Sequence, residues 1–227
     1  MTAADTLSTT LVHAVRPASA PEGAKPPALI LLHGRGTNEN DLLELADYLD
    51  PRFFIISVRA PYPFEGVGGA FTWFDLQGIG RPDVGQFMES YRRLVQFIAD
   101  VKQKYPVDPD RIFLLGFSMG SMMALSVALS KPQLVRGVVA HSGYIPESIP
   151  LKFVWDQLRG LSLFVAHGID DPVLPIAMGR RAHELLSTTE ADLTYREYPI
   201  PHTISEESIA DIGTWFQKVL DVPRDMK

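Results

Sequence analysis

The sequence predicts an α/β fold in which one mostly parallel sheet has helices on both faces. Short runs that are apolar at consecutive positions, such as residues 28–33, alternate with longer stretches of helical periodicity, such as residues 86–104. Strands that are apolar at consecutive positions are buried on both faces, as in a parallel sheet between two helix layers. The chain has 227 residues, of which 46% are hydrophobic, and this suffices for the core of one domain. We therefore expect residues 1–227 to form a single domain.

The expected strands follow from local hydropathy. Residues 9–15 precede a proline- and alanine-rich segment over 17–27, so we expect an antiparallel N-terminal strand and a connecting turn within residues 1–26. Residues 193–198 alternate between apolar and polar positions, which favours a place near a sheet edge. Continuous apolar strands are expected over residues 28–33, 53–58, 111–116, 135–140 and 161–166.

Five segments carry apolar residues at the three-to-four spacing of amphipathic helices. Proline follows three of them, at positions 106, 132 and 223, where a helix should stop. The expected helices cover residues 41–49, 86–104, 119–130, 176–187 and 204–220.

The segment over residues 62–85 interrupts this alternation. Its six glycines disfavour a regular helix, while its aromatic residues need burial. We predict a long loop that folds over the carboxyl edge of the sheet, where open α/β sheets bind ligands.

The composition excludes several classes of function. The net charge is −6, with 27 acidic and 21 basic residues and no long run of one sign, so neither nucleic acid nor an anionic membrane surface is an expected partner. The chain has no cysteine, which excludes disulfides, thiolate metal sites and a cysteine nucleophile. We expect no secretory signal, and no apolar stretch approaches the roughly 18 residues needed to span a bilayer. We expect a cytoplasmic protein without stable membrane insertion.

The strongest functional motif is Gly116-Phe-Ser118-Met-Gly120. It lies between a predicted apolar strand and a predicted apolar helix, which is the context that a Gly-x-Ser-x-Gly turn requires. The chain must reverse sharply there, so the serine adopts a strained backbone and only small residues fit two positions to either side. We expect Ser118 to be a nucleophile raised above the sheet at the N-terminus of a helix, whose dipole favours developing negative charge.

A serine hydroxyl needs a base to take its proton. In proteins with this turn, the acid and then the histidine follow the serine along the chain. His202 lies in a loop after the last strand and before the last helix, so we predict that it is the base. His141 and His167 end strands at or before the position expected for the acid, and His183 lies within a helix.

The acid should leave the carboxyl end of the preceding strand and accept the imidazole N–H. Asp170 and Asp171 both meet this description, and the residues alone do not choose between them. The oxyanion formed during attack needs two backbone N–H donors. We predict that one is Met119, directly after the nucleophile, and that the other is Arg35 in a glycine-containing loop after the first core strand.

From about residue 27 to its end, the chain resembles the phospholipase/carboxylesterase family of α/β-hydrolases. The motifs that carry the resemblance are His33-Gly-Arg-Gly-Thr-Asn-Glu-Asn-Asp41-Leu, Trp73-Phe-Asp75, Gly116-Phe-Ser-Met-Gly120, His167-Gly-Ile-Asp-Asp-Pro-Val173 and His202-Thr-Ile.

The resemblance implies an α/β-hydrolase fold with a minimal cap, no cofactor and no metal site. It implies that Asp171, directly before the proline, is the acid of the triad. Family members include dimers, so a homodimer is one expectation. Two positions depart from the family pattern. Met119 stands where glutamine is more usual, and Arg35 stands where many relatives have a leucine or threonine.

These observations lead to the expectation of a serine carboxylesterase that acts on a small-molecule ester of short to medium chain length. Acyl-protein thioesterase or lysophospholipase activity is the alternative, and a slow-turnover binding protein with this fold is another. A dienelactone-type hydrolase would use a cysteine nucleophile, which this chain lacks. The expected walls of the substrate pocket are Phe71, Trp73, Ile79, Tyr144 and Val173.

Overall fold

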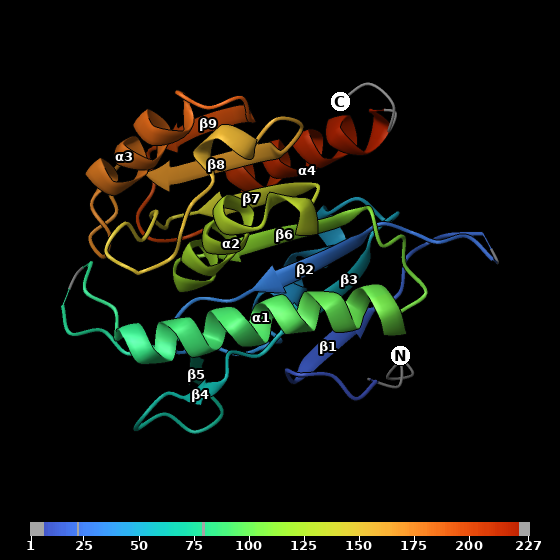
Figure 1. The fold of residues 1–227 in the computed structure, drawn as a ribbon, viewed down its shortest axis with the longest axis horizontal. Helices are drawn as coiled ribbons and strands as arrows, with labels where there is room; N and C mark the ends of the chain where they lie inside the picture. The colour runs from blue at the N-terminus through green and yellow to red at the C-terminus, as the bar shows by residue number, and fades with distance from the viewer. Residues whose placement is uncertain (1–6, 22, 79, 223–227) are drawn as a thin grey trace.

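The computed structural model describes residues 7–21, 23–78 and 80–222, which form a seven-stranded sheet flanked by helices (Figure 1). The strand order is β1-β3-β2-β6-β7-β8-β9. Strand β1 pairs antiparallel with β3 and every other pair is parallel, which confirms the predicted mostly parallel sheet. The strands are β1 (His13–Arg16), β2 (Ala28–Leu32), β3 (Phe54–Val58), β6 (Ile112–Phe117), β7 (Gly137–His141), β8 (Ser162–Gly168) and β9 (Asp192–Tyr198).

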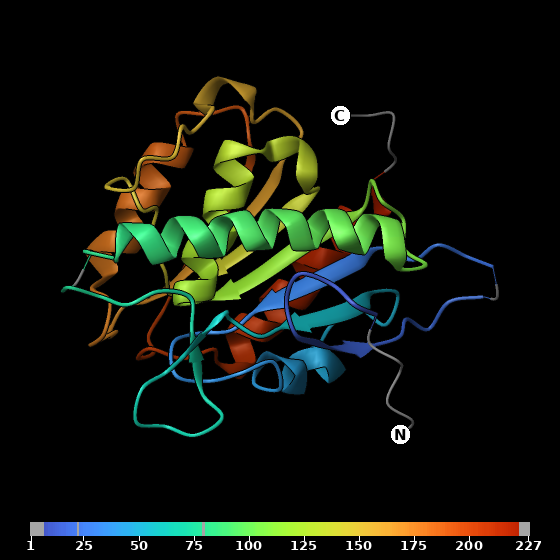
Figure 2. The ribbon, with the colours of Figure 1, turned by 60° about the horizontal axis from the view of Figure 1, so that its bottom comes forward.

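Helices cover both faces of the sheet, as Figures 1 and 2 show. Helices α1 (Val84–Lys104), α2 (Met119–Ser130) and α3 (Ile176–Leu186) contribute to the core on one face. Helix α4 (Glu206–Asp221) and a 3₁₀-helix over Leu42–Tyr48 contribute to the core on the other. Two further 3₁₀ turns cover Pro132–Leu134 and Trp155–Gln157.

The central strand β2 shows why the strands are apolar at consecutive positions. All five of its residues are fully buried. Ile30 and Leu32 belong to the core beneath α1 and α2, whereas Leu29 and Leu31 belong to the core beneath α4. Because successive side chains of a strand point to opposite faces, burial on both faces requires an apolar residue at every position.

The N-terminal strand is shorter and later than the predicted 9–15 segment. Both the backbone N–H and the hydroxyl of Thr10 donate to Asp100 Oδ2 of α1, at 2.9 and 2.6 Å. These bonds hold residue 10 beside the helix, so pairing with β3 begins only at His13.

The segment predicted as a helix over residues 41–49 is a 3₁₀-helix over Leu42–Tyr48 instead. Its buried side chains are Leu42 and Ala46, and the Asp41 side chain makes no capping hydrogen bond. Pro51 follows closely and disfavours helical backbone at the residue before it, so the segment stays a short connector, the usual setting of 3₁₀ turns.

The glycine-rich segment over residues 62–85 forms a short hairpin, in which β4 (Tyr62–Pro63) pairs antiparallel with β5 (Phe71–Thr72). Helix α1 begins at Val84, because the Asp83 side chain caps it by accepting from Gln86 N. No helix in the described ranges is long and apolar enough to cross a membrane.

Candidate active site

Ser118 lies at the sharp turn between β6 and α2, with a φ of +53° and a ψ of −117°. This left-handed backbone is unusual for a residue with a side chain. A Cβ atom on Gly116 would overlap the carbonyl group of Gly120, and one on Gly120 would overlap the carbonyl oxygen of Leu32. Glycine is therefore required on both sides of the serine by backbone-to-backbone approach.

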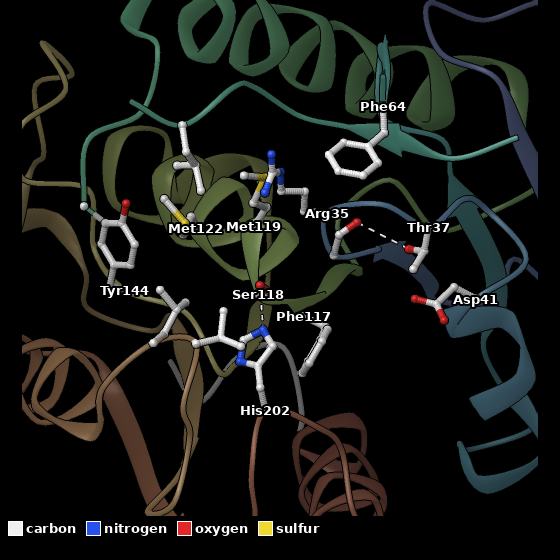
Figure 3. A pocket seen from close by; sticks show the side chains of 15 residues that line it. Arg35, Thr37, Asp41, Phe64, Phe117, Ser118, Met119, Met122, Tyr144 and His202 are labelled. Carbon is white, nitrogen blue, oxygen red and sulfur yellow. Dashed lines mark hydrogen bonds between the residues drawn. The ribbon is translucent and has the colours of Figure 1, made fainter. Parts of the chain in front are cut away.

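Three side chains from different loops form one continuous hydrogen-bonded series. His202 Nε2 lies 2.9 Å from Ser118 Oγ, and His202 Nδ1 lies 2.6 Å from Asp171 Oδ2. Ser118 follows β6, Asp171 follows β8 and His202 follows β9, all at the carboxyl edge of the sheet. Figure 3 shows the imidazole beneath the serine hydroxyl. This is the arrangement in which a base can take the serine proton.

Asp171 is held in place by its own loop. Its Oδ1 atom accepts from the backbone N–H groups of Val173 and Leu174, at 2.8 and 2.9 Å. Burial alone would raise the pKa of this carboxyl, but the hydrogen bonds from His202 and the two backbone groups outweigh it and lower the pKa. Asp170, the other candidate, is exposed.

Among the described residues, His202 is the one downstream histidine whose ring bonds to the serine, whereas His141 meets it through the backbone, since its carbonyl oxygen accepts from the Ser118 N–H at 2.9 Å. His141 and His167 are fully buried, and His183 is exposed on α3 with its ring stacked on Tyr195 at 4.3 Å. His167 Nε2 donates to the carbonyl oxygen of Leu174 at 2.8 Å and lies 3.5 Å from Asp171 Oδ2. His167 thus supports the loop of the acid, a role that sequence reasoning missed although the residue stands four positions before Asp171.

His33 orients the loop that contains Arg35. The Ala60 N–H donates to His33 Nε2 at 3.0 Å, so the ring proton lies on Nδ1 and is donated to the carbonyl oxygen of Gly34 at 2.6 Å. Burial lowers the pKa of His33, which favours this neutral ring. The C=O and N–H of a trans peptide point in opposite directions, so the Arg35 N–H points away from His33.

Met119 is the first residue of α2, and the N–H groups of a first helical turn have no acceptor within the helix. The loop before Arg35 lies close to the nucleophile, because a Cβ atom on Gly34 would be 3.5 Å from Ser118 Cβ. Arg35 and Met119 line the same cavity as Ser118. The two predicted oxyanion donors are therefore brought to the serine.

The serine opens into a cavity of about 390 Å³. Of the predicted pocket walls, Tyr144 and Val173 line it, whereas Ile79 lies outside the described residues. The lining residues are Gly34, Arg35, Thr37, Asp41, Phe64, Leu76, Gly80, Phe117, Ser118, Met119, Met122, Tyr144, Val173, Leu174 and His202.

Two predicted pocket walls, Trp73 and Phe71, are not part of this lining. Trp73 is fully buried, and its indole N–H donates to the carbonyl oxygen of His33 at 2.9 Å, so it supports the neighbouring loop. The Phe71 ring instead packs under the Arg59 guanidinium, which lies 4.5 Å from the ring centroid.

Sequence reasoning missed Phe64 and Met122 as lining residues. Met122 stands four positions after Ser118, so helical periodicity would have placed it on the face of α2 nearest the serine. Phe64 shares its glycine-rich loop with Trp73 and Phe71, and nothing in the local pattern distinguishes the three. Among the residues that the structure describes, no group of three His, Asp or Glu side chains could hold a metal ion.

The sheet, the turn at Ser118 and the position of His202 after the last strand define a hydrolase of the α/β-hydrolase fold. The chain belongs to the phospholipase/carboxylesterase family, whose model matches residues 15–220.

Curated relatives include acyl-protein thioesterase 1 of Debaryomyces hansenii, which is 27% identical over 92% of this chain and 98% of the relative. Among solved structures, the Bacillus cereus carboxylesterase is 25% identical with a TM-score of 0.81, covering 92% of this chain and 94% of that one. A carboxylesterase from Mesorhizobium loti, 20% identical with a TM-score of 0.82, covers 96% of this chain and 99% of its own and supports the fold.

Proposed function

We propose that this chain is a serine carboxylesterase that hydrolyses short- to medium-chain acyl or aryl esters through an acyl-enzyme. The observation that carries the proposal is the hydrogen-bonded series from Asp171 through His202 to Ser118, which ends at the cavity. The family and the relatives named carboxylesterase agree with it.

In the first half of the reaction, His202 Nε2 takes the proton of Ser118 as Oγ attacks the ester carbonyl carbon. The carbonyl oxygen becomes an oxyanion, which the N–H groups of Arg35 and Met119 stabilise. Asp171 stays ionised, accepts a hydrogen bond from the Nδ1–H group and stabilises the imidazolium. The histidine then gives its proton to the leaving alkoxide, and the C–O bond breaks.

In the second half, His202 takes a proton from a water molecule that attacks the acyl-enzyme. The same N–H groups stabilise the second oxyanion. Collapse of this intermediate releases the carboxylic acid and returns the proton to Ser118 Oγ. No group beyond these residues is needed for the balance of atoms and protons.

The cavity supports a substrate of modest size. Its volume of about 390 Å³ lies toward the lower end of small-molecule pockets. Phe64, Leu76, Met122 and Leu174 give it apolar walls suited to an acyl or aryl group.

Thioester hydrolysis is the second candidate, favoured by the relatives named acyl-protein thioesterase. Thioesters and oxygen esters use the same attack on a carbonyl carbon, so the candidates differ in leaving group and acyl length. A slow-turnover binding protein would retain the reactive serine but show little steady-state turnover of either.

The test is hydrolysis of nitrophenyl esters from acetate to decanoate, with thioesters of the same acyl groups, by wild type and Ser118→Ala. The proposal expects turnover that peaks at short or medium oxygen esters and is lost in Ser118→Ala. Faster hydrolysis of long-chain thioesters would establish the second candidate. A folded wild type that turns over none of these esters would refute the esterase assignment.

A further inference from the structure

The Tyr144 side chain has an unusual environment. It is 8% exposed and lines the cavity, and its hydroxyl has no hydrogen-bond partner in the protein. Four other buried side-chain atoms in the described ranges share this condition, but they belong to residues outside the cavity lining. Burial raises the pKa of Tyr144 to about 12, so the hydroxyl keeps its proton at neutral pH. The hydroxyl is therefore a hydrogen-bond donor without an acceptor, and leaving a buried polar group unpaired costs free energy of folding.

Arg35 supplies a positive charge to the same cavity. Its guanidinium lies over the Phe64 ring, 4.7 Å from the ring centroid, which fixes the side chain through a cation–π contact. No carboxylate among the described residues lies within 4.0 Å of this guanidinium, although most other arginines of the described ranges form ion pairs. The edge of the planar group, which carries its N–H donors, stays available.

The other charges of the lining define where an anion could lie. Besides Arg35, the ionisable lining residues are Asp41, Tyr144 and His202. Figure 3 shows Tyr144 and Met122 on one side of Ser118, Asp41 and Thr37 on the other, and Arg35 between the two groups. A negative charge beside Tyr144 would therefore lie on the opposite side of Ser118 from the Asp41 carboxylate, whereas one beside Thr37 would be repelled by that carboxylate.

We propose that the cavity selects esters that carry a second, anionic oxygen group such as a carboxylate, with Arg35 and Tyr144 as the residues that recognise it. The inference rests on the proposed esterase function and specifies its substrate class. The guanidinium pairs with the anion, the Tyr144 O–H donates to it, and the apolar surface of Met122 accommodates the carbon chain between the anion and the scissile ester. Charge-assisted hydrogen bonds of this kind are among the stronger polar contacts.

The test compares matched pairs of esters by acid release at pH 8. Monoethyl glutarate against ethyl pentanoate places the charge in the acyl part, and 3-acetoxypropanoate against propyl acetate places it in the alcohol part. We expect kcat/KM to favour the anionic member of at least one pair by about tenfold. The preference should weaken as salt is added, because Arg35 is exposed.

Three variants test which residues cause the preference for the anionic ester. Arg35→Met should bring the ratio of the two kcat/KM values close to one, Tyr144→Phe should lower it by about threefold or more, and Asp41→Asn should raise it. The ratio is the readout because the Arg35 backbone N–H also belongs to the proposed oxyanion hole. Arg92→Gln is the matched control, since this exposed arginine of α1 pairs with Glu89 away from the cavity, and it should leave the ratio unchanged.

A wild-type preference for the neutral member of both pairs overturns the inference while leaving the esterase function intact. An unchanged ratio in Arg35→Met or in Tyr144→Phe removes that residue from the recognition site. If neither member of any pair is hydrolysed and a fluorophosphonate does not label the protein, the esterase function fails, and the inference fails with it.

Discussion

Gly120, at the start of α2, packs directly on Leu32, at the end of β2. A Cβ atom on Gly120 would overlap the carbonyl oxygen of Leu32, which belongs to a fully buried central strand. Neither backbone can yield without moving the helix off the sheet, since protein interiors are close-packed. This contact sets the height of the α2 N-terminus and hence of Ser118 above the sheet edge.

Gly120→Ala should therefore lower the free energy of unfolding by about 3 kcal/mol or more. Gly68→Ala is the matched control, because a Cβ atom there meets nothing within 4 Å and the backbone is not left-handed. Urea unfolding of both variants measures the difference. Equal stability of the two would show that α2 can shift without cost.

Because the backbone of Ser118 is strained, a glycine at this position should be more stable than an alanine, the reverse of the usual order of stability. At ordinary positions glycine is less stable than alanine by about 0.5–1 kcal/mol. At a φ of +53° and a ψ of −117°, Ser118→Gly should instead unfold with a free energy about 1 kcal/mol above that of Ser118→Ala. Thermal or urea unfolding of the two variants measures the difference. A glycine variant less stable than the alanine variant would mean that the turn is unstrained.

The two adjacent aspartates predict unequal kinetic effects. Asp171 accepts from His202 at 2.6 Å, whereas Asp170 is exposed. Asp171→Asn should lower kcat by at least about a hundredfold, and by up to about 10⁴-fold, because an amide does not stabilise the imidazolium. Asp170→Asn should change kcat by less than about twofold, as surface changes usually do. Ester turnover by both variants is the measurement, and the reverse order would reassign the acid.

The burial of His141 predicts that part of the protein's stability is lost as the pH falls. Burial, and then the neighbouring His167 and His202, lower its pKa from 6.5 to about 3. Between these pH values the unfolded chain binds a proton at this residue and the folded chain does not, so stability falls as pH falls. One proton corresponds to at most about 1.4 kcal/mol per pH unit.

His141→Phe, which keeps an aromatic ring in the core, should make the decline of stability between pH 6 and 4 shallower by up to that amount. His13 and His33 are also buried with lowered pKa values, so part of the decline remains in the variant. Urea unfolding at several pH values provides the slope. An identical slope in wild type and variant would show that His141 does not titrate on unfolding.

Much of the fold was predictable because burial on both faces leaves a local signal. Consecutive apolar residues identified the strands of the parallel sheet, and alternation placed residues 193–198 near an edge, where β9 lies. The 3₁₀-helix over Leu42–Tyr48 was not predictable in the same way, because its apolar spacing resembles that of an α-helix and a proline after its end, Pro51, is compatible with either kind of helix.

The chemistry of the site was more predictable than its walls. Ser118 was identified by its Gly-x-Ser-x-Gly turn between a strand and a helix, and His202 by its place after the last strand. The structure brings Ser118 Oγ and His202 Nε2 within 2.9 Å. The choice of Asp171 over Asp170 needed the family resemblance.

Trp73 and Phe71 were misplaced because an aromatic residue in a glycine-rich loop can face the cavity or the core. What decides is a contact with a residue distant in sequence, such as the bond from Trp73 to His33.

The central claim is that Ser118 is a nucleophile activated by His202 and Asp171. Intact-mass measurement after incubation with a fluorophosphonate tests it most directly. The account predicts one adduct per wild-type chain, located on Ser118 by peptide mapping, absent in Ser118→Ala and formed at least about a hundredfold more slowly in Asp171→Asn. Labelling of Ser118→Ala at the wild-type rate, or no adduct on folded wild type, would contradict it.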